Sequence, residues 1–133
     1  MLNGTSVIDF KEHSKKEDVS EFLITIREKN PNKEIVIFCD NFNSHRADYT
    51  RQIAKDNSIN LVFLPKYSPD LNPIEYIWKS IKRVISRILV RDIDHMRALI
   101  RDSFLENASK LSFAGYWIER FLGGANWYKK FGF

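Results

Sequence analysis

Two acidic residues each follow an apolar run of the chain. Asp40 comes directly after the run EIVIFC at residues 34–39, and Glu75 follows the run at residues 59–64 across a proline-rich loop. Neighbouring parallel strands end at the same edge of a sheet, so both carboxylates would reach one patch if these runs are paired strands. Two carboxylates held close repel each other unless a cation lies between them. Oxygen ligands of this kind favour Mg²⁺ or Mn²⁺ over zinc.

The loop before Glu75 is unusually stiff. Three of the four prolines in the chain, Pro65, Pro69 and Pro73, lie in it. Proline fixes φ and biases the preceding residue toward extended conformations. Pro73 suits the first position of a helix, and Asn72 can cap that helix. We expect this rigid loop to place Glu75 accurately, as a metal-binding carboxylate requires.

Each candidate also has a simpler interpretation. Glu75 lies three residues after Asn72, where a glutamate often only completes a helix cap. An aspartate after a buried strand is often a turn former. His45 can act as a base or a ligand, although a lone histidine before a helix is more often structural. In the cluster at residues 92–95, capping by Asp92 explains the pattern better than metal binding does. The sequence alone leaves these alternatives open.

Around these residues, short apolar runs alternate with amphipathic stretches. We expect strands at 5–10, 34–39 and 59–64, helices at 15–29, 46–57 and 73–90, and two more helices at 92–107 and 112–122 that begin at caps. A capping-box pattern, Ser14 with Glu17, precedes the first helix. The second and third runs are apolar enough to be buried on both faces. The alternation predicts an α/β fold with parallel strands, right-handed crossovers and three C-terminal helices.

The composition is that of one globular domain. The chain has 133 residues, 44% of them hydrophobic, and a mean hydropathy of −0.36. We expect a single domain over 1–133, with a core at 5–122 and a tail at 123–133. The tail could contact DNA or a second subunit, but packing on the core is the favoured interpretation. The single cysteine excludes a disulfide framework, and neither a secretory signal nor an apolar run of about 18 residues is present, so we expect a cytoplasmic protein. A net charge of +4 and a pI of about 9.2 point weakly to an anionic partner.

Two blocks of the sequence resemble a known family. CDNFNSHRA and LVFLPKYSPDLNPIEYIWKSIKR are similar to the catalytic core of transposases of the mariner superfamily, in its prokaryotic insertion-sequence branch. The 34 residues between Asp40 and Glu75 are the interval typical of the DDE branch of that superfamily. The resemblance runs from about Thr5 to about Leu122. It implies a ribonuclease-H-like fold and a DDE endonuclease that acts in DNA transposition and recombination through phosphodiester hydrolysis and transesterification.

The resemblance implies roles for the matched residues. Asp40 corresponds to the second catalytic acid and Glu75 to the third, and both would bind Mg²⁺ or Mn²⁺ in a two-metal mechanism. Asn41 and His45 match the DN-x-x-x-H pattern and, with Asn72, are candidate supporting residues.

One part of the family pattern has no match. The first catalytic aspartate belongs to the first strand of the sheet, whereas residues 5–10 best match the third strand. We therefore expect the first two strands to be missing and this chain to be the carboxyl-terminal part of a catalytic domain. Asp9 lies in the wrong place in the strand order to substitute. The chain alone should then be inactive or nearly so, and the alternative function is that of a non-catalytic remnant that binds DNA or another transposase subunit.

Basic residues follow Glu75, most of them at steps of three and four, and one more lies in the proline loop before it. The candidate DNA contacts are Lys66 in the loop and, after Glu75, Lys79, Lys82, Arg83 and Arg87. We expect them to hold the DNA backbone with an affinity that falls with salt, although an ordinary solvated helix face is the alternative. The expected partners are DNA and a second copy of the chain, because a sheet without its first two strands would expose an edge that invites pairing. We expect neither a membrane nor a small-molecule cofactor.

Overall fold

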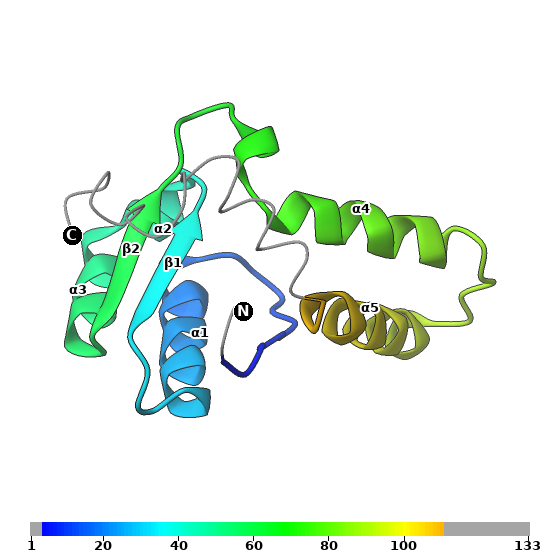
Figure 1. Cartoon of the computed structure of the whole chain (residues 1–133), viewed down its shortest axis with the longest axis horizontal. Coiled ribbons are helices and arrows are strands. Elements are labelled where there is room, and N and C mark those ends of the chain that lie inside the picture. The colour runs from blue at the N-terminus through cyan, green and yellow to red at the C-terminus, as the bar shows by residue number, and fades with distance from the viewer. Residues whose placement is uncertain (1–3, 111–133) are drawn as a thin grey trace. The chain divides into compact units, whose positions relative to one another are not determined.

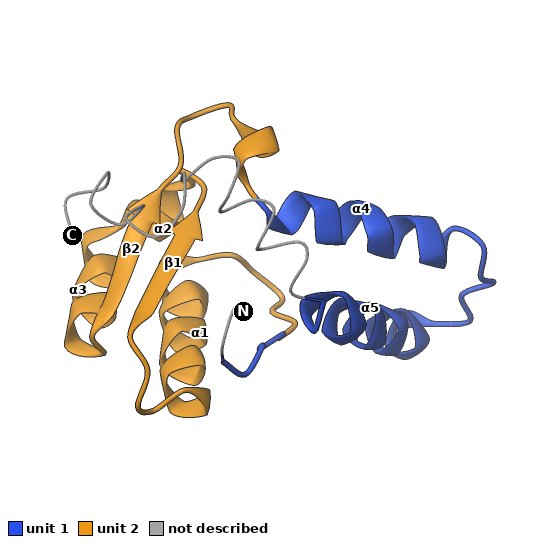
Figure 2. Ribbon diagram, viewed as in Figure 1, with its two compact units in different colours: residues 1–8, 73–133 blue, residues 9–72 orange. Residues whose placement is uncertain are grey.

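The computed structural model of the chain describes residues 4–110. Along the chain the elements are α1 (Lys16–Lys29), β1 (Ile35–Cys39), α2 (Asn43–Arg46), α3 (Asp48–Asp56), β2 (Ile59–Phe63), the 3-10 helix η1 (Pro69–Leu71), α4 (Ile74–Ile85) and α5 (Ile93–Ala108) (Figure 1). They fall into two compact units (Figure 2). One unit is residues 9–72, and the described residues of the other are 4–8 and 73–110. The predicted helix at 112–122 and tail at 123–133 lie outside the described residues.

The sheet of the first unit is a parallel pair. β1 and β2 run side by side in register from Ile35 opposite Ile59 to Cys39 opposite Phe63. The pairing continues for one step, because the Leu64 amide donates to the Cys39 carbonyl at 2.8 Å. The predicted parallel arrangement of an α/β fold is confirmed for these two strands. Their carboxyl ends therefore lie together at one edge, as Figure 1 shows.

Two predictions about the sheet are wrong. In the described residues the sheet has two strands, and residues 5–10 are not one of them. A run of apolar residues becomes a strand only where a neighbour completes its backbone hydrogen bonds, and periodicity does not reveal that neighbour. The two strands are also not buried on both faces: Ile35, Ile59 and Val62 are buried, while the other strand residues are half-buried.

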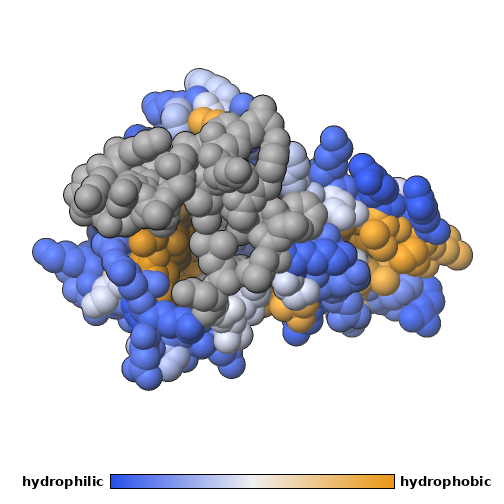
Figure 3. Space-filling model, in the orientation of Figure 1, coloured by the Kyte–Doolittle hydropathy of each residue, from blue (hydrophilic) through white to orange (hydrophobic). Residues whose placement is uncertain are grey.

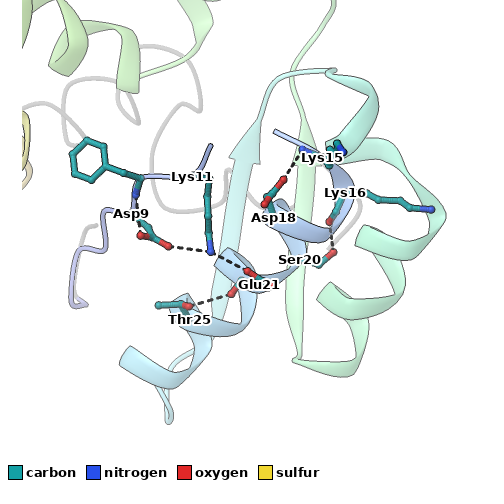
Figure 4. Close-up of polar contacts among 9 residues, drawn as sticks. Asp9, Lys11, Lys15, Lys16, Asp18, Ser20, Glu21 and Thr25 are labelled. Atoms are coloured by element: carbon teal, nitrogen blue, oxygen red, sulfur yellow. Dashed lines mark hydrogen bonds and ion pairs between the residues drawn. The ribbon is translucent and has the colours of Figure 1, made fainter. Parts of the chain in front are cut away.

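Local contacts fix the segment that precedes α1. The Asp9 carboxylate accepts from the Phe10 amide at 2.8 Å and lies 3.3 Å from Lys11 Nζ, which is also 2.9 Å from Glu21 Oε2 (Figure 4). Glu21 and then Asp9 raise the pKa of the Lys11 ammonium. Asp9 is therefore paired with a cation of its own unit.

The start of α1 differs from the prediction by one residue. Lys15 occupies the N-cap position, and its amide donates to the Asp18 carboxylate at 3.0 Å (Figure 4). The predicted Ser14 and Glu17 box is therefore wrong. Asp18 lies three residues after Lys15, so the capping carboxylate keeps the expected spacing although the helix begins one residue later.

Arg27 joins two connections of the first unit, the one from α1 to β1 and the one from α3 to β2. Its guanidinium donates to the carbonyls of Asn57 and Ser58, each at 2.8 Å, and to those of Asn30 at 3.1 Å and Lys33 at 2.8 Å. These carbonyls lie after α1, before β1 and between α3 and β2. The core beside this hub consists of the buried apolar side chains Leu23, Ile26, Ile35, Ala54, Ile59, Val62 and Leu64.

The second unit contains an α-helical hairpin. α4 packs against α5, Ile81 and Phe104 are buried there, and the rings of Trp78 and Phe104 lie 5.9 Å apart. The Asp92 carboxylate accepts from the His95 amide at 2.8 Å, which confirms the predicted cap of α5.

The helix predicted at 73–90 is shorter in the structure. α4 ends at Ile85. Val84 and Ile88, which the apolar spacing predicts on the core side, are exposed. Leu89, in the connection from α4 to α5, and Ile93, the first residue of α5, are also exposed, and an apolar area is visible in this region in Figure 3. Across residues 4–110, no helix combines the length and the hydropathy of a transmembrane span.

Candidate functional site

Asp40 stands at the carboxyl end of β1, as predicted. Its side chain is 64% exposed. One oxygen, Oδ1, accepts from the Phe42 amide at 3.2 Å and lies 2.7 Å from His45 Nδ1. Within the described part of the chain, Oδ2 makes neither a hydrogen bond nor an ion pair. The turn-forming role that the sequence left open is therefore real, and it uses only one of the two oxygens.

Asn41 connects the ends of the two strands. Its Nδ2 donates to the Leu64 carbonyl at 2.7 Å. Leu64 is the first residue after β2, and its amide already binds the last residue of β1. The turn that carries Asp40 is thus fixed to the beginning of the proline loop. Asn41 thus orders the loop that carries Asp40, and its supporting role in a metal site stays a prediction.

His45 lies on α2, a short helix that the sequence analysis treats as loop. The Phe42 ring meets the His45 ring edge-on, with centroids 5.8 Å apart. The Ser44 carbonyl accepts from the buried Thr50 hydroxyl at 2.6 Å, and the Ser44 hydroxyl donates to the Ser14 carbonyl at 2.6 Å. These bonds hold α2 against α3 and the start of α1, so His45 reaches Asp40 from a fixed support. Alternating hydrophobicity carries no signal for such contacts.

The break between α2 and α3 corrects the helix predicted at 46–57. Ala47 is extended, with φ of −56° and ψ of 141°, and it separates the two helices. Thr50 binds across this break to Ser44.

Cys39 is adjacent to Asp40 and half-buried. Burial, and then the neighbouring Asp40 carboxylate, raise the pKa of its thiol to about 11. Its Sγ lies 3.8 Å from the Val62 carbonyl. A raised pKa makes the thiol a weaker nucleophile at neutral pH.

The proline loop begins at the carboxyl end of β2 and is closed by hydrogen bonds between its own backbone groups. The Leu71 amide donates to the Ser68 carbonyl at 3.1 Å, and the Asn72 amide to the Pro69 carbonyl at 3.0 Å. These bonds form η1. Tyr67, at the outer end of the loop, has a positive φ of 58° and a side chain that is 99% exposed. The sequence analysis missed this residue, although an aromatic residue between Lys66 and a Ser-Pro pair is a signal that it could have used.

Glu75 lies in the first turn of α4 with an exposed side chain. The helix begins at Ile74, one residue later than predicted, and Pro73 takes the N-cap position. In the region that the structure describes, the Glu75 carboxylate makes neither a hydrogen bond nor an ion pair. The helix-cap interpretation of Glu75 is therefore not supported. Glu75 belongs to the second unit and Asp40 to the first.

The candidate DNA contacts are all exposed. Lys79, Lys82 and Arg83 lie on α4, whereas Arg87 lies beyond its end. Lys66 belongs to the proline loop of the other unit. Lys79, Lys82 and Arg83 make no ion pair within residues 4–110, so their charges are available to an anionic partner.

The structure gives no ready-made metal centre within the described residues. No three His, Cys, Asp or Glu side chains gather there closely enough to hold one ion. Asp40 and Glu75 each offer a carboxylate oxygen that makes neither a hydrogen bond nor an ion pair among the described residues, and oxygen donors of this kind suit Mg²⁺ or Mn²⁺.

Comparison with known proteins gives one match. The family model of the DDE superfamily endonuclease matches residues 2–97, which include Asp40, Glu75 and the proline loop. Searches of curated proteins and of solved structures returned no match.

Proposed function

Because this chain belongs to the DDE superfamily of endonucleases, we propose that it is the catalytic part of a DNA transposase. The observation that carries the proposal is that the family match spans both blocks, the one with Asp40 and the one with Glu75. We assign it more narrowly to the mariner superfamily, in its insertion-sequence branch, with a ribonuclease-H-like fold. Its reaction is then metal-dependent strand cleavage and strand transfer in DNA transposition, and its site of action is the cytoplasm.

In this proposal Asp40 and Glu75 hold the divalent ions. Asp40 contributes Oδ2, since His45 and the Phe42 amide engage Oδ1. Glu75 contributes a carboxylate without a competing partner among the described residues. Divalent ions held by these two carboxylates would activate a water molecule or a DNA 3′-hydroxyl and would stabilise the leaving oxygen. The role of the chain is to hold these oxygens still, and the bonds of Asn41 and the proline loop serve that role.

We also propose that the chain alone cleaves DNA slowly or not at all. The family uses a further aspartate, and Asp9 does not serve, because its carboxylate contacts Lys11 and the Phe10 amide. Metal binding is therefore a better test of the site than cleavage.

The experiment is a Mn²⁺ titration of the chain followed by electron paramagnetic resonance. Asp40→Asn and Glu75→Gln should each lower the Mn²⁺ affinity by at least about tenfold, because each removes a ligand oxygen. Asp70→Asn is the matched control, since it neutralises an exposed aspartate of the proline loop and should leave the affinity unchanged. The double variant should bind Mn²⁺ at least as weakly as the weaker single variant, because both carboxylates would ligate the same ions. Equal affinities for Asp40→Asn, Asp70→Asn and the unchanged chain would refute the assignment.

A second candidate function is a non-catalytic module that binds DNA or another transposase subunit. Lys79, Lys82 and Arg83 favour it, because they are exposed and make no ion pair with any residue of the described stretch 4–110. DNA affinity without measurable Mn²⁺ affinity would support this function over the first. In either case we propose a homodimer, which light scattering would detect as twice the chain mass of 15.7 kDa.

A further inference from the structure

Tyr67 combines two features that a surface tyrosine rarely has together. Its side chain is 99% exposed, so it contributes almost nothing to the core. Its φ of 58° lies in the left-handed region, which is costly for a bulky residue and natural for glycine. Stability alone would favour glycine or asparagine at this position. Strain of this kind is most often found at sites of binding or catalysis.

The surroundings of Tyr67 belong to a rigid and basic loop. Pro65 and Pro69 restrict the backbone on either side, and the Ser68 hydroxyl donates to the Lys66 carbonyl at 3.3 Å. Lys66, the residue before Tyr67, is exposed. The ring is thus presented to solvent on a restricted backbone, in a loop that also carries a cation.

The loop begins at the edge of the sheet where Asp40 lies. Asn41 binds Leu64, the first residue of the loop, and both Asp40 and Tyr67 belong to the unit formed by residues 9–72 (Figure 2). Phe42, two residues after Asp40, is 51% exposed and offers a second aromatic ring at this edge. Exposed aromatic rings beside cations form the usual surface for unpaired nucleotides, because each base can stack on a ring while a cation holds its phosphate.

We propose that Tyr67 stacks on an unpaired base of DNA while Lys66 binds the adjacent phosphate. This inference rests on the proposed function, which makes DNA the substrate. A single ring next to a lysine fits a nucleotide better than a protein partner, which would require a broad apolar surface. In this proposal Tyr67 holds a DNA strand whose base pairs are locally opened, and it positions that DNA strand near Asp40.

The test compares DNA binding with folding in the same variants. Fluorescence anisotropy would measure affinity for an oligothymidylate strand and for a duplex, and an unpaired 2-aminopurine in the duplex would report stacking. Tyr67→Gly should weaken single-strand binding by about tenfold and abolish the 2-aminopurine quenching. Tyr67→Phe should keep both. The melting temperature of Tyr67→Gly should be no lower than that of the unchanged chain, because glycine accepts a positive φ.

The control is Tyr49→Ala, which removes a half-exposed tyrosine of the same unit and should leave single-strand affinity unchanged. Single-strand affinity that is equal in Tyr67→Gly and in the unchanged chain would overturn the stacking while leaving the proposed function intact. Absence of binding to any DNA by the unchanged chain would overturn both. Loss of binding that accompanies a lower melting temperature in Tyr67→Gly would also overturn the inference, since Tyr67 would then be structural.

Discussion

Asp40 shows how one carboxylate can serve a turn and still offer an oxygen to an ion. Its Oδ1 accepts a hydrogen bond from the Phe42 amide and contacts the His45 ring nitrogen. These two contacts leave the side chain little freedom to rotate. Its Oδ2 remains open among the described residues. Hydrogen bonds around a metal ligand fix its orientation and affect metal affinity nearly as much as the ligand itself. His45 is thus a positioning residue in the proposed site.

The His45 contact gives a testable consequence. His45→Ala should lower the Mn²⁺ affinity by about tenfold, because Asp40 loses a partner that holds it in place. His45→Asn should restore most of the affinity, since the asparagine amide can reach the position of the imidazole Nδ1. His13→Ala is the control, because His13 is also exposed and precedes α1. The titration used for Asp40→Asn measures all three variants. A titration in which His45→Ala and His13→Ala behave alike would contradict the role.

At the scale of elements, the spacing of apolar residues predicts helices and strands correctly where local properties of the sequence determine them. The predicted elements at 15–29, 34–39, 59–64 and 92–107 agree with α1, β1, β2 and α5 within a residue or two. Their apolar spacing and caps are local properties of the sequence. The errors arise where contacts with residues far away in the sequence decide the secondary structure. Residues 5–10 have the composition of a strand but do not pair with the sheet. The short helix α2 is held by hydrogen bonds to Thr50 and Ser14.

The Arg27 hub is another feature that local patterns do not encode. Arg27 is a basic residue in the last turn of α1, and sequence patterning would leave it as a solvated side chain. In the structure it binds carbonyls from two connections, so it joins α1 to the turn at Ser58, more than 30 residues away. Charged donors make the stronger hydrogen bonds of proteins.

We expect Arg27→Ala to lower the free energy of unfolding by about 2 kcal/mol, because several charge-assisted bonds are lost and water replaces them only in part. Urea unfolding followed by circular dichroism would measure it. Lys29→Ala is the matched control from the same turn, and it should change stability by less than about 0.5 kcal/mol because Lys29 is exposed. Equal effects of the two substitutions would show that the hub does not stabilise the unit.

For the whole molecule, sequence and structure give different information about the proposed metal site. The positions of Asp40 and Glu75 follow from the family resemblance, and their local surroundings follow from β1, β2 and α4. Their convergence on one ion stays a prediction, because Asp40 and Glu75 belong to different units. The period of a helix or strand says where that element's core face lies, and it carries no information on how two units meet. A Mn²⁺ titration of the Asp40 and Glu75 variants would test whether the two carboxylates bind the same ion, which sequence patterns cannot reveal.

The basic character of the chain makes a prediction at this same scale. The formal net charge is +4, and a general attraction to DNA would depend only on that total. Specific backbone contacts on α4 depend instead on where the charges lie. Lys82→Glu with Arg83→Glu reverses two charges in the last turn of α4. Lys29→Glu with Lys55→Glu makes the same change in charge in the last turns of α1 and α3.

If α4 holds the DNA backbone, the α4 pair should weaken binding and flatten the slope of log affinity against log salt by roughly 2, one unit for each lost phosphate contact. The control pair should reduce affinity at low salt through net charge but keep the slope. Anisotropy titrations across a salt series measure both, and circular dichroism confirms that each variant remains folded. Identical slopes for the two pairs would mean that α4 presents an ordinary solvated face, the alternative that the sequence left open. A slope that flattens only for the α4 pair places the DNA on the helix that begins beside Glu75.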